Sequence, residues 1–229
     1  MSTKVETRLY AMADGDLKQK ADGLKTTINR DLPDFATRNI TATQVTAYQT
    51  VIDVFDSTTT DEELLGAVMV ATEAKNVMAD HLRKTIRTIR SMAHIAYDGK
   101  GKYSIFGFEE LSKLTDADLY KLTKRVVRVG GKLFTDLAAQ GLTQAQLTNL
   151  DNLAKAFDTA IDAVEEAIET RDLETQDRIL KGNTLWQEML RLAAIGKSLY
   201  EDTNEAKFND YVLISAATGG KEPVTLVVG

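Results

Sequence analysis

An internal repeat constrains the fold of this chain more than any other feature. Residues 40–56 align without a gap with residues 142–158, at an offset of 102 positions. The identical pairs include Thr41 with Thr143, Gln44 with Gln146, Phe55 with Phe157 and Asp56 with Asp158. Apolar positions recur as well, which indicates that both copies need the same core contacts. Two copies of one pattern predict a duplicated fold.

The repeat extends over most of the chain. Asp14-Gly-Asp-Leu matches Asp116-Ala-Asp-Leu at the same offset, and a later set matches at an offset of 103. The later pairs are Thr72 with Thr175, Leu82 with Leu185, Ile86 with Met189, Ile89 with Leu192 and Tyr97 with Tyr200. We therefore place repeat one at about 9–97, a connector at 98–112 and repeat two at about 113–200.

Apolar residues recur every three or four positions along most of the chain, which is the spacing of helices with one buried face. Only two prolines interrupt it, Pro33 and Pro223. Thr41 with Gln44, and Thr143 with Gln146, have the spacing of a helix capping box. Gly141 is placed to end the fourth helix in a left-handed conformation. The expected helices are 14–30, 41–55, 60–97, 115–140, 143–168, 172–200 and 204–217.

These helices predict an all-α fold. We expect a six-helix antiparallel bundle built from two three-helix repeats, because pairing two such units buries the apolar surface that each leaves uncovered. The single bundle would cover residues 1–219 and include the short C-terminal helix 204–217. Aromatic and aliphatic residues in the connector predict that it folds back over a helix end. Residues 220–229 form a β-prone tail.

Composition excludes several classes of function. The chain has no cysteine, which removes disulfides, thiolate catalysis and cysteine-ligated metals. Its net charge of −6 argues against a general nucleic-acid binder. No Sec-type signal peptide or membrane-spanning run is visible, so we expect a cytoplasmic protein, or one exported without such a signal. Neither His81 nor His94 completes a Glu-x-x-His metal motif, and we expect no metal or other cofactor.

Basic residues form stripes at helical spacing. One stripe is Arg83, Arg87 and Arg90, and the other is Lys121, Arg125, Arg128 and Lys132. Residues 81–140 hold 12 Lys/Arg and 6 Asp/Glu, whereas residues 141–178 hold 3 and 9. One interpretation is that these helices are neighbours whose surface charges pair, each pair contributing little. The alternative is a patch that binds an anionic ligand, or opposite charged faces that let copies stack.

Two further features suggest contacts. Gly130 and Gly131 lie inside a helix, where close approach of a neighbouring helix, a kink or a ligand cleft would explain them. The tail residues Pro223, Val224, Leu226 and Val228 read as a lone strand, which pairs with another chain by strand addition or stays unstructured.

A resemblance adds to this picture. Phe106-Gly-Phe, Leu114-Thr-Asp-Ala-Asp-Leu, Gly141-Leu-Thr and Lys207-Phe-Asn-Asp-Tyr resemble segments of uncharacterised all-helical proteins from Bacteroidetes-type bacteria. Such proteins often carry a C-terminal β domain resembling a carboxypeptidase regulatory domain, which is not expected here because the chain ends at Gly229. The resemblance implies no catalytic activity.

The sequence therefore predicts a non-enzymatic structural or protein-interaction module, a subunit or adaptor of a larger assembly. Its partner would be another protein or a second copy of the chain. The expected interaction residues are Arg83, Arg87, Arg90, Lys121, Arg125, Arg128, Pro223, Val224, Leu226 and Val228. The alternative is a bundle that binds a small anionic or apolar ligand between the repeats, near Gly130, Tyr97 and Tyr200.

Overall fold

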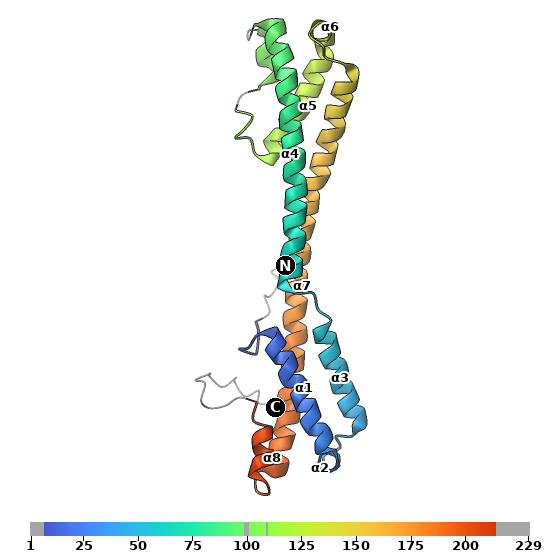
Figure 1. The fold of residues 1–229 in the computed structure, drawn as a ribbon, viewed down its shortest axis with the longest axis vertical. Coiled ribbons are helices and arrows are strands. Elements are labelled where there is room, and N and C mark those ends of the chain that lie inside the picture. Colours follow the sequence, from blue (N-terminus) through green and yellow to red (C-terminus); the bar gives the residue numbers. More distant parts are fainter. Residues whose placement is uncertain (1–6, 99–100, 109, 214–229) are drawn as a thin grey trace, which may run out of the picture. The chain divides into compact units, whose positions relative to one another are not determined.

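The computed structural model of the protein describes residues 7–98, 101–108 and 110–213. All regular secondary structure in these ranges is helical (Figure 1). The elements are α1 (Asp14–Arg30), α2 (Leu32–Ala36), α3 (Ala42–Asp56), α4 (Asp61–Tyr97), the 3₁₀ helix η1 (Gly101–Phe106), α5 (Asp116–Lys132), α6 (Phe134–Ala138), α7 (Gln144–Tyr200) and α8 (Glu205–Asp210). The predicted all-α class is confirmed. The β-prone tail lies outside the described residues.

Helix starts follow the local signals in the sequence. The backbone N–H of Thr41 donates to the side chain of Gln44 at 3.0 Å, and that of Thr143 donates to Gln146 at 2.8 Å. Each threonine also accepts from the backbone three residues on, which completes the box. The two predicted capping boxes are therefore confirmed.

Three helix ends differ from the prediction. The fourth helix stops at Lys132 instead of continuing to residue 140, because the chain bends at Leu133 and α6 brings Leu137 into the core. The fifth and sixth helices are one helix, α7, since residues 168–175 contain neither proline nor glycine to end it. The helix predicted over 204–217 ends at Asp210, and residues 214–217 lie outside the described part.

The chain divides into two compact units. Unit 1 comprises residues 1–60 and 172–229, and unit 2 comprises residues 61–171. Each has its own cluster of buried hydrophobic side chains. This division differs from the single bundle expected over residues 1–219.

The units do not coincide with the predicted repeats. Unit 1 contains α1 and α3, from the first repeat, with the C-terminal part of α7, from the second. Unit 2 contains α5 and the N-terminal part of α7 with α4, from the first repeat. In each unit, therefore, the third helix comes from the other repeat. Periodicity defined which face of a helix is buried but not which helices it meets.

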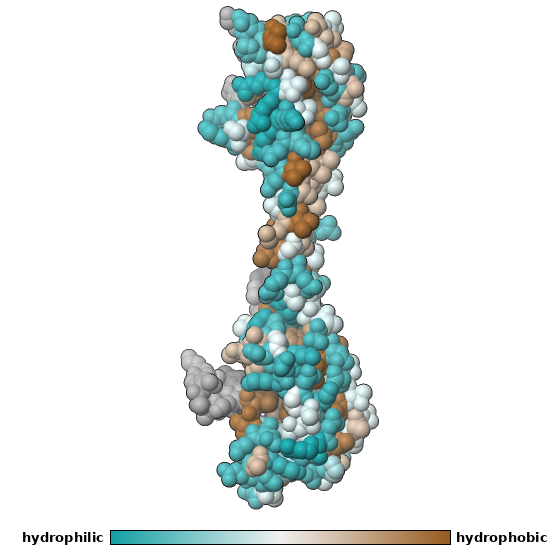
Figure 2. Space-filling view, in the orientation of Figure 1, coloured by the Kyte–Doolittle hydropathy of each residue, from teal (hydrophilic) through white to brown (hydrophobic). Residues whose placement is uncertain are grey.

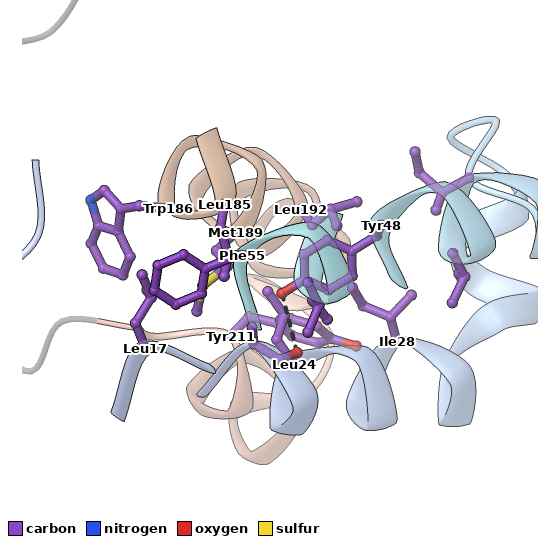
Figure 3. Close-up of a cluster of buried hydrophobic side chains, with 14 of the residues drawn as sticks. Leu17, Leu24, Ile28, Tyr48, Phe55, Leu185, Trp186, Met189, Leu192 and Tyr211 are labelled. Carbon is purple, nitrogen blue, oxygen red and sulfur yellow. Dashed lines mark hydrogen bonds between the residues drawn. The ribbon is translucent and has the colours of Figure 1, made fainter. Parts of the chain in front are cut away.

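The core of unit 1 includes two aromatic side chains that pack against glycines of α7. Figure 3 shows Leu185, Met189 and Leu192 from α7 facing side chains of α1 and α3. A Cβ atom at Gly196 would lie 2.3 Å from the ring of Tyr211, and one at Gly182 would lie 2.3 Å from the Tyr10 hydroxyl. These two aromatic side chains thus occupy space that only glycine leaves open. Trp186 of α7 is also buried in this core.

The core of unit 2 includes the predicted connector. Phe106 and Phe108 are buried and stack with their ring centroids 4.9 Å apart, and Leu111 is buried beside them. The prediction that the connector folds back onto the helices is confirmed. Gly130 lies against Leu147, whose Cδ2 would be 2.9 Å from an added Cβ. Close approach of a neighbouring helix therefore explains this glycine.

Backbone features recur between the two halves. The bounds of α1 and α5, and of α2 and α6, differ by 102 positions at both ends. Asn39 and Gly141 occupy equivalent positions before the capping boxes, and both have positive φ, 60° and 95°. Asparagine and glycine are the residues that tolerate this left-handed conformation at least cost.

Candidate functional site

The predicted basic stripe of α4 is held by contacts within unit 2. Arg83 pairs with Asp80 at 3.2 Å, and its side chain is one-fifth exposed. The Nε–H of Arg90 donates to the hydroxyl of Tyr103 at 3.0 Å. Arg87 is exposed. These interactions fix two of the three arginines against their neighbours and support a structural role for them.

The basic residues of α5 are arranged differently. Arg125, Arg128 and Lys132 line one hollow of about 330 Å³, together with Val129, Leu133 and Ile105. Lys121, one turn earlier on α5, is exposed and does not line it. The structure therefore brings together two of the predicted interaction residues, Arg125 and Arg128, with Lys132 from the same stripe.

Ion pairs between helices of unit 2 use other lysines. Lys124 of α5 pairs with Asp151 of α7, and Lys75 of α4 pairs with Asp116 of α5. The hydrogen bond from Lys124 holds the pKa of Asp151 below its ordinary value. Charge pairing between neighbouring helices, one of the two interpretations of the sequence, thus occurs, but outside the predicted stripes.

A tyrosine, an aspartate and a lysine meet in unit 1. The Tyr200 hydroxyl donates to Asp34 at 2.6 Å, and Lys207 Nζ lies 3.3 Å from the same carboxylate oxygen. Lys207 also lies over the Tyr200 ring, 4.7 Å from its centroid. Lys207 also pairs with Asp31 at 2.8 Å, so its ammonium group is shared between two carboxylates and the face of an aromatic ring.

The same three residue types meet in unit 2. The Tyr97 hydroxyl donates to Asp136 at 3.1 Å, and Lys102 pairs with that carboxylate at 2.7 Å and lies over the Tyr97 ring. Asp34 and Asp136 are 102 positions apart, and Tyr97 and Tyr200 are 103 apart, so these two members of each triad are equivalent, whereas Lys102 and Lys207 are not at equivalent positions. The tyrosine and the aspartate of each triad come from different repeats.

These triads link helices to one another, and their tyrosines do not act as general bases. Burial, helped by the hydrogen bond to Asp34, raises the pKa of the Tyr200 phenol to about 12, and burial raises the pKa of Tyr97 as well. A phenol with so high a pKa stays protonated near neutral pH and does not accept a proton. Each triad instead ties the end of a long helix to the short helix α2 or α6.

The two tyrosines considered for a ligand site therefore each have a partner in their own unit. A second hollow, of about 450 Å³, lies between α4 and α7 in unit 2 and is lined by His81, Lys84, Thr85, Thr88, Ile89, Gln146, Asn149 and Leu153. It contains no carboxylate. Within the described ranges, no group of three or more His, Asp or Glu side chains is placed to hold a metal ion.

Exposed apolar residues recur at equivalent positions of α4 and α7, and sequence reasoning missed them. Val70 and Leu173 are each 68% exposed, and they are equivalent at the offset of 103. Two more pairs are equivalent and exposed: Leu65 with Ile168, and Val77 with Leu180. Figure 2 shows hydrophobic, brown residues at the surface among hydrophilic ones. The offset of 103 aligns these residues with one another, but only the structure shows that they are exposed.

Comparisons with protein-family models, with curated proteins and with solved structures gave no match. None of the helices in the described part of the chain has the length and apolar character needed to cross a membrane.

Proposed function

We propose that the protein is a non-enzymatic interaction module, a subunit or adaptor that binds a partner protein through its long helices. In this proposal the chain is a duplicated three-helix repeat. The third helix of each repeat, α4 or the C-terminal part of α7, packs with the first two helices of the other repeat. Recurrence of exposed apolar side chains at equivalent positions is the observation that carries it.

Exposed aliphatic side chains are common on protein surfaces when they are scattered singly. Here Val70 and Val77 are two turns apart on α4, and Leu173 and Leu180 repeat the arrangement on α7. Residues seven apart lie on nearly the same line of a helix. Two copies of such a pair, one in each unit and each on the solvent side of its helix, support a partner-binding surface on each unit.

Charge narrows the kind of partner. Residues 161–177 of α7 hold seven Asp or Glu and one arginine, and residues 61–77 of α4 hold four and one lysine. The acidic residues near the apolar pairs repel a second acidic surface and attract a basic one. The apolar pairs therefore suit a partner segment that carries apolar and basic side chains, more than the same face of a second copy.

Site-specific cross-linking in an extract of the source cells tests this proposal. A photoreactive benzoylphenylalanine is introduced at Val70 or at Leu173, with Asn76, exposed on another side of α4, as the control position. We expect one discrete cross-linked polypeptide of the same size from both positions and none from Asn76. Val77→Ser with Leu180→Ser should weaken the product, because it removes the other half of each apolar pair.

Light scattering after size exclusion separates self-association from binding of another chain. A monomeric protein with a discrete cross-link supports a different partner, whereas an oligomer that dissociates in the serine variant supports a second copy. A monomer that gives no discrete product at either position would overturn the proposal.

A further inference from the structure

The hollow on α5 combines three cations with an apolar wall. Arg125, Arg128 and Lys132 are separated by three and four residues, so they share one face of the helix. Ile105, which is 58% exposed, borders the same hollow from η1. All of these residues belong to unit 2.

The connector is shaped to receive one of these cations. Gly107 has a φ of 66°, and a Cβ atom there would lie 2.3 Å from Nη1 of Arg125. The guanidinium group therefore lies against backbone where no side chain intervenes. A positive φ and close approach are both tolerated by glycine alone at low cost.

The positive charge of the hollow has no counter-ion inside the part of the protein that the structure describes. Arg125, Arg128 and Lys132 form no ion pair with the described carboxylates, although Lys124 on the same helix pairs with Asp151. Lys132, in the last turn of α5, also interacts favourably with the helix dipole. Arg125 lies two turns from that end and gains little from it.

The first repeat provides an internal comparison. Arg30 is equivalent to Lys132 at the offset of 102, and it pairs with Asp31 at 2.7 Å and Asp210 at 2.8 Å. The residue equivalent to Asp31 is Leu133, so unit 2 keeps the cation and lacks that acid. Gly23 and Thr26 stand where the second repeat has its two arginines. In unit 1 the charge of Arg30 is neutralised by carboxylates of the same unit. In unit 2 three cations lie together without such partners among the described residues.

We propose that this hollow binds a small molecule carrying an oxyanion, a phosphate or carboxylate, attached to an apolar body. Arginine forks suit the paired oxygens of such groups, and the lysine adds a point charge. Ile105, Val129 and Leu133 contact the apolar body. A volume of about 330 Å³ is at the small end of ligand pockets, which favours one compact molecule over an extended chain.

Titration of the full-length, ¹⁵N-labelled protein by NMR at low salt tests the site. The probes are phenyl phosphate, benzoate, inorganic phosphate and phenol. We expect phenyl phosphate or benzoate to shift amide signals of η1 and the second half of α5 and to bind more tightly than inorganic phosphate. Phenol, which lacks the charge, should cause no such shifts. Raising the salt should weaken binding, because screening affects exposed charges.

Substitutions to glutamine inside and outside the hollow are compared, and each removes one positive charge. Arg128→Gln with Lys132→Gln should weaken binding of the better organic anion by about tenfold or more, which is about 1.4 kcal/mol or more. Lys121→Gln, on the same helix outside the hollow, should leave the dissociation constant within about twofold. All three changes are at exposed positions, where substitutions alter stability by about 0.5 kcal/mol or less, so folding is preserved.

Three results would overturn the proposal. The first is equal affinity of the double variant and the wild-type protein. The second is a set of shifts spread over other basic segments, including Arg30 of unit 1. The third is tighter binding of an acidic peptide than of either organic anion, since it would assign the cations to a protein partner. The proposed function is tested separately, by cross-linking at Val70 and Leu173, so these results do not affect it.

Discussion

The hydroxyl of Tyr211 donates to the carboxylate of Asp31 at 2.9 Å, across 180 residues of sequence, and both side chains are buried. Arg30 and Lys207 pair with the same carboxylate at 2.7 and 2.8 Å. Asp31 follows the last residue of α1, and Tyr211 follows the last residue of α8, so this carboxylate joins the C-terminal ends of these two helices within unit 1.

Replacing Asp31 should change the response of the protein to acid. The hydrogen bond from Arg30, with those from Lys207 and Tyr211, holds the pKa of Asp31 well below its ordinary value, against the opposing effect of burial. An unfolded aspartate has a pKa of about 3.9, so the stabilisation is complete above about pH 5 and is lost as the pH falls towards the lower folded pKa. Asp31→Asn should cost about 1–3 kcal/mol at pH 7 and flatten the acid-unfolding profile below pH 5, followed by circular dichroism.

Asp202→Asn is the control for this experiment. It makes the same change of charge at an exposed position in the turn before α8. Its stability should stay within about 0.5 kcal/mol of the wild type at pH 7. An acid profile for Asp31→Asn as steep as that of the control would contradict the role of this carboxylate.

Fragments of the chain should fold according to the units and not according to the repeats. The fragment 61–171 contains a complete hydrophobic cluster, so it should be helical and unfold cooperatively. The fragment 1–97, which covers the first repeat, has α1 and α3 without the part of α7 that covers them. It should expose apolar surface and lack dispersed NMR signals and a cooperative thermal transition.

Addition of the fragment 172–213 to the fragment 1–60 should restore the cooperative transition of unit 1, because the mixture contains the described residues of its core. A well-folded fragment 1–97 beside an unfolded 61–171 would show instead that each repeat packs with itself. Far-ultraviolet circular dichroism and thermal melts of the separate and mixed fragments distinguish the two outcomes.

Alanine at Gly196 should destabilise unit 1. The added Cβ would lie 2.3 Å from Cγ of Tyr211, whose side chain is fully buried. Overpacking of this kind costs about 1–3 kcal/mol, which exceeds the gain of up to about 1 kcal/mol from replacing glycine inside a helix. Chemical denaturation should therefore show a net loss.

Gly23→Ala in α1 is the matched substitution. Apart from the adjoining residues and the backbone of α1 itself, no atom lies within 4 Å of the added Cβ, so only the gain in helix propensity remains. The variant should be more stable than the wild type by about 0.5–1 kcal/mol. If both alanine variants are stabilised equally, the ring of Tyr211 does not fill the space beside Gly196.

Local signals predicted much of the secondary structure. The bounds of α1, the capping boxes at Thr41 and Thr143, and the buried stripe along α4 follow from residues within one or two turns of each other. The end of α5 did not follow in the same way. Pro33 marks the bend after α1, but the equivalent bend at Leu133 has no proline, and the burial of Leu137 accompanies it.

The candidate sites were predicted only in part. The basic stripe of α5 could be read from its spacing, and two of its predicted residues line the hollow. That Arg30 is paired while Lys132 is not depends partly on the adjacent Asp31, whose equivalent is Leu133, and partly on Asp210, which is remote in sequence. The exposed pairs on α4 and α7 needed a structure, because an apolar residue in a helical pattern is ordinarily expected to be buried.

The sequence by itself determined that the chain is helical, that its pattern occurs twice, and which face of most helices is apolar. Only the tertiary structure decided which helices share a core. Both repeats present the same apolar stripes, so periodicity alone lets a third helix pack with either pair of partners. Side-chain shape is one difference between the alternatives, since Tyr211 fits beside Gly196, whereas the equivalent position of α4 is Ala93, whose methyl group would occupy that space.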